Sequence, residues 1–147
     1  MKITTHSALE TQEIARKIAL HAFNGLTVLL SGDLGAGKTT FTQGLALGLH
    51  IHKTVSSPTF TIMKNYQGDF KLNHIDAYRL EDLHQDLGFE ELIGKEGITV
   101  IEWPDFIQDL WPNHFIKIDF KYISEETREL SFTYLGEKES QIVEHLL

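Results

Sequence analysis

The fold is decided by the stretch Ser31-Gly32-Asp33-Leu34-Gly35-Ala36-Gly37-Lys38-Thr39-Thr40. It satisfies the pattern G-x-x-x-x-G-K-[ST], in which backbone N–H groups of a glycine-rich loop surround a phosphate. An apolar run at 26–30 precedes it and predicts a buried strand, while Phe41, Leu45 and Leu49 follow it at helical spacing. This order of strand, loop and helix is the context that the pattern requires, so the stretch predicts a nucleotide site.

Each residue type in the loop has a chemical reason to be there. Glycines allow positive φ and let backbone N–H groups approach an anion without a Cβ in the way. A helix that starts near Lys38 directs free N–H groups and the positive end of its dipole at the same point. The Lys38 ammonium adds a full charge, and the Thr39 hydroxyl is a ligand for Mg²⁺. The predicted phosphate-binding residues are Gly32, Asp33, Leu34, Gly35, Ala36, Gly37, Lys38, Thr39 and Thr40.

The composition predicts one domain over residues 1–147, because 41% hydrophobic residues suffice for a substantial core. The chain has no cysteine, which excludes disulfides, thiolate metal sites and cysteine catalysis. No apolar run approaches the roughly 20 residues of a membrane span, and 1–6 lack the apolar core of a signal peptide. We therefore expect a cytoplasmic protein with no membrane partner.

The net charge of −8 argues against a firm, direct grip on DNA or RNA, because such binding rests largely on lysine and arginine at phosphates. An acidic protein can still act on nucleic acid through a basic partner. Three arginines occur, Arg16, Arg79 and Arg128. Of these, we expect only Arg79 near a candidate site.

The remaining pattern predicts an α/β fold. Apolar periodicity and end signals predict helices at 7–23, 38–49, 80–93, 106–110 and 140–147. The first has a capping signal at Ser7 and Glu10, with Leu9, Ile14 and Ile18 on its apolar face, and in the second Gly44 and Gly48 mark close packing on the sheet. Apolar or alternating runs predict strands at 26–30, 59–66, 70–75, 98–103, 116–122 and 130–134, and those at 59–66 and 70–75 form a hairpin. We expect a P-loop NTPase-like fold, with a central mixed sheet, helices on both faces and an antiparallel strand pair toward the C-terminus.

Two carboxylates stand where a magnesium–nucleotide site needs them. Glu102 ends the apolar strand at 98–101, and Asp76 ends the segment at 72–75. Ligands gather at the carboxyl ends of strands in open α/β sheets. One acid can hold the metal with Thr39, directly or through water, and the other can orient the attacking water. We expect Glu102 in the metal role and Asp76 in hydrolysis, the alternative for each being an ordinary acid at a strand end.

Several other residues have two readings. Arg79 either stabilises transition-state charge in cis or pairs with an acid of the next helix. Ser57, Pro58 and Thr59 form the best candidate for a loop that senses the γ-phosphate. Trp103 is either plain core or, through its place beside Glu102, part of the site. His50 and His52 resemble a metal pair but lack a third ligand, so we expect surface histidines.

Two further features narrow the function. The guanine-selecting N-K-x-D sequence does not occur, which favours ATP over GTP by elimination. Kinases of small metabolites commonly clamp two anionic substrates with several arginines, often in a lid, and this chain has neither many arginines nor an obvious lid. A small-molecule P-loop kinase is the main alternative to a nucleotide-driven switch. A sensor that binds ATP without meaningful turnover is a third possibility.

Four motifs together resemble those of the TsaE (YjeE) family, and the likeness covers nearly the whole chain. The motifs are Gly32-Asp33-Leu34-Gly35-Ala36-Gly37-Lys38-Thr39-Thr40-Phe41, Ser57-Pro58-Thr59-Phe60-Thr61, His74-Ile75-Asp76-Ala77-Tyr78-Arg79-Leu80 and Glu102-Trp103. The phosphate loop alone is generic, whereas this combination in this order is highly specific. TsaE is the bacterial P-loop ATPase of tRNA threonylcarbamoyladenosine biosynthesis.

The resemblance implies a weak ATPase that acts as a switch on two partners. These are TsaD, which transfers the threonylcarbamoyl group, and its companion TsaB, so that tRNA is met only indirectly. By position, Lys38 and the loop amides would bind the phosphates of ATP, and Thr39 and Glu102 would serve Mg²⁺. Asp76 would support hydrolysis, residues 57–59 would form the switch loop, and Trp103 matches the family tryptophan beside the acid. A site completed by a partner would also account for the few arginines.

Overall fold

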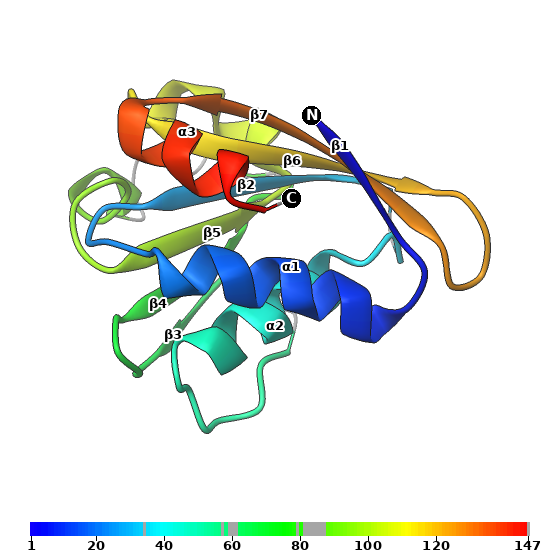
Figure 1. Cartoon of the computed structure of the whole chain (residues 1–147). Coiled ribbons are helices and arrows are strands. Elements are labelled where there is room, and N and C mark those ends of the chain that lie inside the picture. Colours follow the sequence, from blue (N-terminus) through cyan, green and yellow to red (C-terminus); the bar gives the residue numbers. More distant parts are fainter. Residues whose placement is uncertain (34, 57, 59–61, 79, 81–87, 147) are drawn as a thin grey trace.

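The computed structural model describes residues 1–33, 35–56, 58, 62–78, 80 and 88–146. Within these residues, strands form one sheet in the order β1-β7-β6-β2-β5-β4-β3 (Figure 1). The strands are β1 (Lys2–Thr5), β2 (Thr27–Gly32), β3 (Met63–Tyr66), β4 (Leu72–Asp76), β5 (Ile98–Glu102), β6 (Phe115–Tyr122) and β7 (Arg128–Leu135). The predicted mixed α/β sheet is therefore confirmed.

The centre of the sheet is parallel and its two margins are antiparallel. Strand β2 lies between β5 and β6 and runs parallel to both, and β4 runs parallel to β5. The outer pairs β3–β4, β6–β7 and β1–β7 are antiparallel. Because β2, β4 and β5 share one direction, their carboxyl ends lie at one edge of the sheet.

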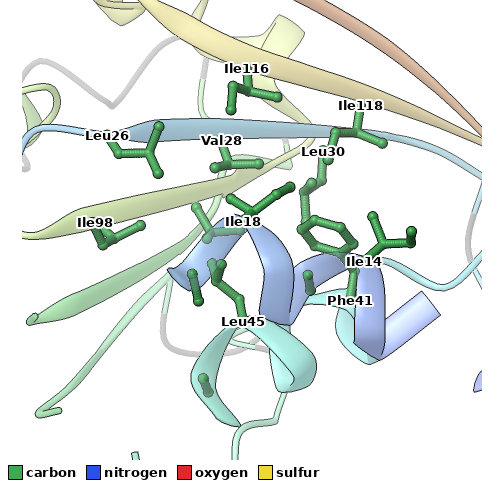
Figure 2. Packing of buried hydrophobic residues seen from close by; sticks show 14 of the residues in the cluster. Ile14, Ile18, Leu26, Val28, Leu30, Phe41, Leu45, Ile98, Ile116 and Ile118 are labelled. Atoms are coloured by element: carbon green, nitrogen blue, oxygen red, sulfur yellow. The ribbon is translucent and has the colours of Figure 1, made fainter. Parts of the chain in front are cut away.

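Alternation along β2 separates two apolar layers. Val28 and Leu30 belong to a large cluster with the α-helices, whereas Leu29 belongs to a second cluster on the opposite face. Figure 2 shows Ile18, Phe41 and Leu45 of the two long helices gathered against Val28 and Leu30. All of these side chains are fully buried, so the period of two places successive residues of β2 in different cores.

The described α-helices all contribute to the first cluster. They are α1 (Ala8–Leu20), α2 (Lys38–Gly48) and α3 (Glu137–Glu144). The second face is covered, in the described part of the chain, by the 3₁₀ segments η2 (Phe89–Glu91) and η3 (Pro104–Leu110). Helical structure thus lies on both faces as expected, but the longer helices share one side.

Two glycines set how closely α1 and α2 pack. A Cβ on Gly44 would lie 2.5 Å from the Gln12 backbone, and one on Gly48 would lie 2.5 Å from Ala19 Cβ. These glycines were expected to mark close packing on the sheet, and glycine in a helix interior weakens it by about 1 kcal/mol relative to alanine. The contact is helix against helix and leaves no room for a side chain.

Helix α1 begins where its capping signal predicted. Ser7 is the N-cap and its Oγ accepts a hydrogen bond from the Glu10 N–H at 3.1 Å, which satisfies one free donor of the first turn. The helix ends at Leu20 rather than at Phe23. Leu9 is 75% exposed, unlike its buried neighbours on the predicted apolar face, Ile14 and Ile18.

The other boundaries differ in detail from the prediction. The hairpin β3–β4 and the pair β6–β7 are confirmed as antiparallel. Residues 59–61, at the start of the strand predicted at 59–66, lie outside the described residues. Half of the predicted helix at 80–93, residues 81–87, also lies outside them, and Phe89–Glu91 is a 3₁₀ segment. Helix α3 starts at Glu137, three residues before the prediction at 140. Strand β1 was not predicted.

Candidate nucleotide and metal site

A cavity of about 600 Å³ lies where β2, β4 and β5 end. Its walls come from the loop before α2, from the ends of β4 and β5, and from the start of β7. The lining residues are Gly35, Gly37, Lys38, Thr39, Thr40, Asp76, Tyr78, Glu102, Trp103 and Arg128. This volume is in the ordinary range for small-molecule sites, and segments far apart in sequence meet in it.

The loop between β2 and α2 adopts the backbone that its glycines allow. Gly32, Gly35 and Gly37 have φ of 133°, 78° and 108°, values that residues with a side chain rarely adopt. At Gly32 space is also short, since a Cβ there would lie 2.5 Å from the Phe120 carbonyl oxygen. The Ala36 N–H donates to the Asp33 carbonyl at 3.1 Å. Leu34 lies outside the described residues.

Lys38 is 4% exposed although it is a lysine. Its ammonium donates to the Gly32 carbonyl at 2.7 Å and lies 3.8 Å from the centroid of a Trp103 ring. Burial lowers the pKa of Lys38 from its ordinary value, and the negative charges of Glu102, Asp76 and Asp33 act in the opposite direction. The cation is thus held at the loop by a carbonyl and an aromatic face.

Trp103 owes its place to an uncommon backbone conformation. Its φ of 57° lies in the left-handed region, which for an aromatic residue costs about 1–3 kcal/mol and is held only by surrounding structure. Its ring packs on Tyr78 with centroids 5.3 Å apart, and Tyr78 packs on Phe106 at 5.4 Å. Trp103 therefore forms an aromatic wall of the cavity over Lys38, which favours the second of its two readings.

The two carboxylates stand side by side. Asp76 and Glu102 are Cα partners in the parallel pair β4–β5, and both line the cavity with Lys38. Burial raises the pKa of Asp76, as does the nearby charge of Glu102, while the hydrogen bond from the Tyr78 N–H to Oδ1, at 3.0 Å, opposes the rise together with His74 and Lys38. A carboxyl group that is partly removed from water and lies beside a second carboxyl group, as Asp76 does, can bind either a proton or a cation.

His74 contacts Glu102 beneath the cavity. Its Nε2 lies 2.6 Å from Glu102 Oε2, and the two side chains are 0% and 7% exposed. A second histidine–carboxylate pair, His50 Nδ1 with Asp69 Oδ2 at 2.6 Å, is 71% and 55% exposed. His50 and His52 are exposed as predicted.

Arg128 is the cavity residue that sequence reasoning missed. Its guanidinium donates to the carbonyls of Ser124, Glu125 and Thr127, and reaches the Gly35 carbonyl of the loop at 3.4 Å. The expectation that only Arg79 lies near the site is therefore wrong, and Arg79 itself lies outside the described residues. Arg128 begins β7, and no local signal showed that β6 lies beside the loop strand and β7 beside β6.

The expected γ-phosphate loop is only partly described. Ser57 and Thr59 lie outside the described residues, whereas Pro58 is buried and its carbonyl accepts from the Ile62 N–H at 2.9 Å. Nearby, the Lys64 ammonium donates to Ser56 Oγ at 2.7 Å. None of these described residues lines the cavity, so the predicted switch loop remains a prediction.

Among the residues that the structure describes, no group of three histidine, cysteine, aspartate or glutamate side chains is placed to hold a metal. Among the described residues that line the cavity, Thr39, Thr40, Asp76, Tyr78 and Glu102 carry a side-chain oxygen. No helix in the described part is long and apolar enough to span a membrane.

Comparison with known proteins agrees with these features. The family model described as "Threonylcarbamoyl adenosine biosynthesis protein TsaE" matches residues 5–130. The chain is 42% identical to the tRNA threonylcarbamoyladenosine biosynthesis protein TsaE of Bacillus subtilis, covering 99% of this chain and 93% of that protein. It is 35% identical to the protein of the same name from Treponema pallidum, covering 89% and 98%.

A solved structure agrees as well. The crystal structure of YdiB from Bacillus subtilis superposes with a TM-score of 0.87 at 37% identity, over 99% of this chain and 93% of YdiB. The match of the family model and of full-length relatives shows that the chain belongs to the TsaE family of tRNA threonylcarbamoyladenosine biosynthesis proteins.

Proposed function

We propose that the chain is a magnesium-dependent ATPase of low intrinsic rate, which works as a nucleotide-driven switch on the TsaB–TsaD pair. The observation that carries this proposal is the meeting of the glycine loop, Lys38 and Thr39 with Asp76 and Glu102 in one cavity. The phosphate-binding loop and the two carboxylates come from distant parts of the chain. A magnesium–nucleotide site needs both.

The loop fits a polyphosphate. Positive φ at Gly35 and Gly37 turns the backbone directly before α2, and the first N–H groups of α2 have no carbonyl partner within the helix. A Cβ built on Gly35 would meet nothing within 4 Å, so the loop borders open space on that side. The arrangement supports a P-loop NTPase-like site with β2 as the loop strand.

The donor set fits Mg²⁺ better than a cation that needs an all-protein cage. Magnesium prefers oxygen ligands and is commonly bound through one or two carboxylates together with substrate phosphates and water. Thr39 and Glu102, which line the cavity together with Asp76, would hold it. When bound there, Mg²⁺ neutralises charge that develops on the β- and γ-phosphates.

The chain's own residues have separable tasks. The Lys38 ammonium exchanges the Gly32 carbonyl for phosphate oxygens, which its position at the loop allows. Asp76, whose pKa burial raises, accepts a hydrogen bond from the attacking water and orients it. Trp103, with Tyr78 packed against its ring, covers one side of Lys38 and shields the ammonium from water.

A slow rate in isolation and a response to partners follow from the few cations in the cavity. Lys38 and Arg128 are the described lysine and arginine residues that line it, and Arg128 is already bonded to backbone carbonyls. Transition-state charge on a phosphoryl group is often met by an arginine supplied in trans. TsaB and TsaD are the proposed partners, and the net charge of −8 fits a protein that meets tRNA only through them, in the cytoplasm.

The test is steady-state ATP hydrolysis by the pure protein, alone and with TsaB and TsaD added. We expect a low, Mg²⁺-dependent rate that rises at least tenfold with both partners, and no rise with bovine serum albumin as control protein. A rate that ignores the partners would contradict the switch. Saturable transfer of phosphate from ATP to a small metabolite would point to the alternative, a P-loop kinase.

A further inference from the structure

We propose that His74 is a positioning residue that holds Glu102 in the orientation needed to bind Mg²⁺. The inference rests on the proposed magnesium–nucleotide function and deepens it. It assigns a task to a buried histidine that does not line the cavity and therefore does not reach the nucleotide.

The strand geometry places the two side chains on one face. In the parallel pair β4–β5, Asp76 is opposite Glu102 and His74 is opposite Val100. Residues two apart on a strand point to the same face, so His74 lies one step behind Asp76, beneath the carboxylate row. From there its Nε2 reaches Glu102 Oε2 at 2.6 Å.

The proton on this contact can be assigned. A carboxylate only accepts hydrogen bonds, so Nε2 must carry the proton that is shared with Glu102. The other ring nitrogen, Nδ1, is buried and has no hydrogen-bond partner among the described residues. With Nε2–H as the donor, Oε2 of Glu102 is occupied, and Oε1 is the oxygen that remains for the cation.

Burial makes the contact selective for one orientation of Glu102. His74 is fully buried, so the groups packed around its ring restrict how far it can follow a carboxylate that swings away. In metal sites, ligand carboxylates are themselves hydrogen-bonded, and loss of such an outer partner typically lowers metal affinity or activity about 10–100-fold. The exposed pair His50–Asp69, in which Nδ1 lies at the same 2.6 Å from Asp69 Oδ2, carries no such constraint.

The experiment compares two amide variants, His74→Gln and His74→Asn, by equilibrium titration with a non-hydrolysable ATP analogue. A glutamine amide reaches toward the place of Nε2, while an asparagine amide stops near Nδ1. The readout is the ratio of the analogue's Kd without Mg²⁺ to its Kd with Mg²⁺. Thermal unfolding of each variant verifies that the protein titrated is folded, and His50→Asn is the matched control.

We expect His74→Asn to lower the Mg²⁺ enhancement at least tenfold while leaving the metal-free Kd within twofold of wild type. His74→Gln should keep most of the enhancement, and His50→Asn should keep all of it. Equal enhancement in both His74 variants, whether retained or lost, would overturn the role of the Nε2 donor, as would retention by the asparagine variant alone. A wild-type protein without any enhancement would instead overturn the proposed metal function, and this inference with it.

Discussion

Two groups of glycines, separated by less than two helical turns, do different work. Gly35 and Gly37 in the loop are needed for their backbone angles, because both have positive φ. Gly44 and Gly48 in α2 are needed for their lack of volume, because a Cβ on either would meet α1 at 2.5 Å. One group shapes a binding surface and the other shapes the core, which shows that a glycine in a sequence has no single meaning.

The difference predicts that binding and folding can be damaged separately. The loop borders the cavity, so changes there should act on ligands. The α1–α2 contact lies in the main apolar cluster, so changes there should act on the free energy of unfolding.

Lys38→Ala is the strongest test of whether changes in the loop act on ligand binding. We expect the affinity for ATP to fall about 10–100-fold, because hydrogen bonds to charged groups are worth about 1.5–3 kcal/mol. Isothermal titration calorimetry measures it. The control is Lys95→Ala, an exposed lysine that does not line the cavity. An affinity within twofold of wild type in the Lys38 variant would remove the lysine from the site.

The core side is tested by Gly44→Ala. The added methyl would collide with the Gln12 backbone, and overpacking a core costs about 1–3 kcal/mol, so the Tm should fall by several degrees. The ATP affinity of the folded protein should stay unchanged. Leu47→Ala is the control, since Leu47 is 55% exposed on the same helix. Weaker ATP binding at unchanged stability would show that the two groups of glycines are not separable.

Arg128→Ala probes whether the loop's surroundings also serve binding. We expect ATP affinity to fall about three- to tenfold, less than for Lys38, because the guanidinium is already bonded to backbone carbonyls and is partly exposed. Fluorescence titration with a labelled ATP analogue measures it. Arg16→Ala is the control, because Arg16 pairs with Glu13 on exposed α1 surface. An unchanged Kd would make Arg128 a purely structural residue of the hairpin.

The smallest expected effect is a pH dependence from Asp76. Because its pKa is raised in the folded state, the folded chain binds a proton more readily than the unfolded chain does. Stability from this group is therefore full below its unfolded pKa and is lost as the pH rises through the folded pKa. Asp76→Asn should accordingly be more stable than wild type at pH 7, and the difference should shrink toward pH 4. Chemical denaturation at both pH values measures it, and a constant difference would contradict the assignment.

Local pattern predicted the elements whose signals are local. The phosphate loop, the N-cap at Ser7 and the hairpin β3–β4 follow from short-range chemistry and were predicted from it. Strand β1 was missed because four residues near the N-terminus become a strand only by pairing with Arg128–Ser131 of β7. Leu9 was placed on the apolar face of α1 because helical spacing does not show where that face ends.

The part of the site that could be predicted is the part that lies at the ends of strands. Asp76 and Glu102 could be named from their positions after apolar runs, but their adjacency depends on β4 lying beside β5. Arg128 and the contact between His74 and Glu102 depend on the order of strands, which no periodicity contains. The sequence therefore names candidate residues, while only the topology says which of them meet.

The most direct test of the central claim is a calorimetric titration with ATP, with and without Mg²⁺, on wild type and Thr39→Ala. We expect Mg²⁺ to tighten ATP binding by wild type, and Thr39→Ala to lose most of this gain while binding metal-free ATP as before. Wild type that binds ATP equally with and without Mg²⁺, or a variant that keeps the full gain, would contradict a metal site between the loop and the strand ends.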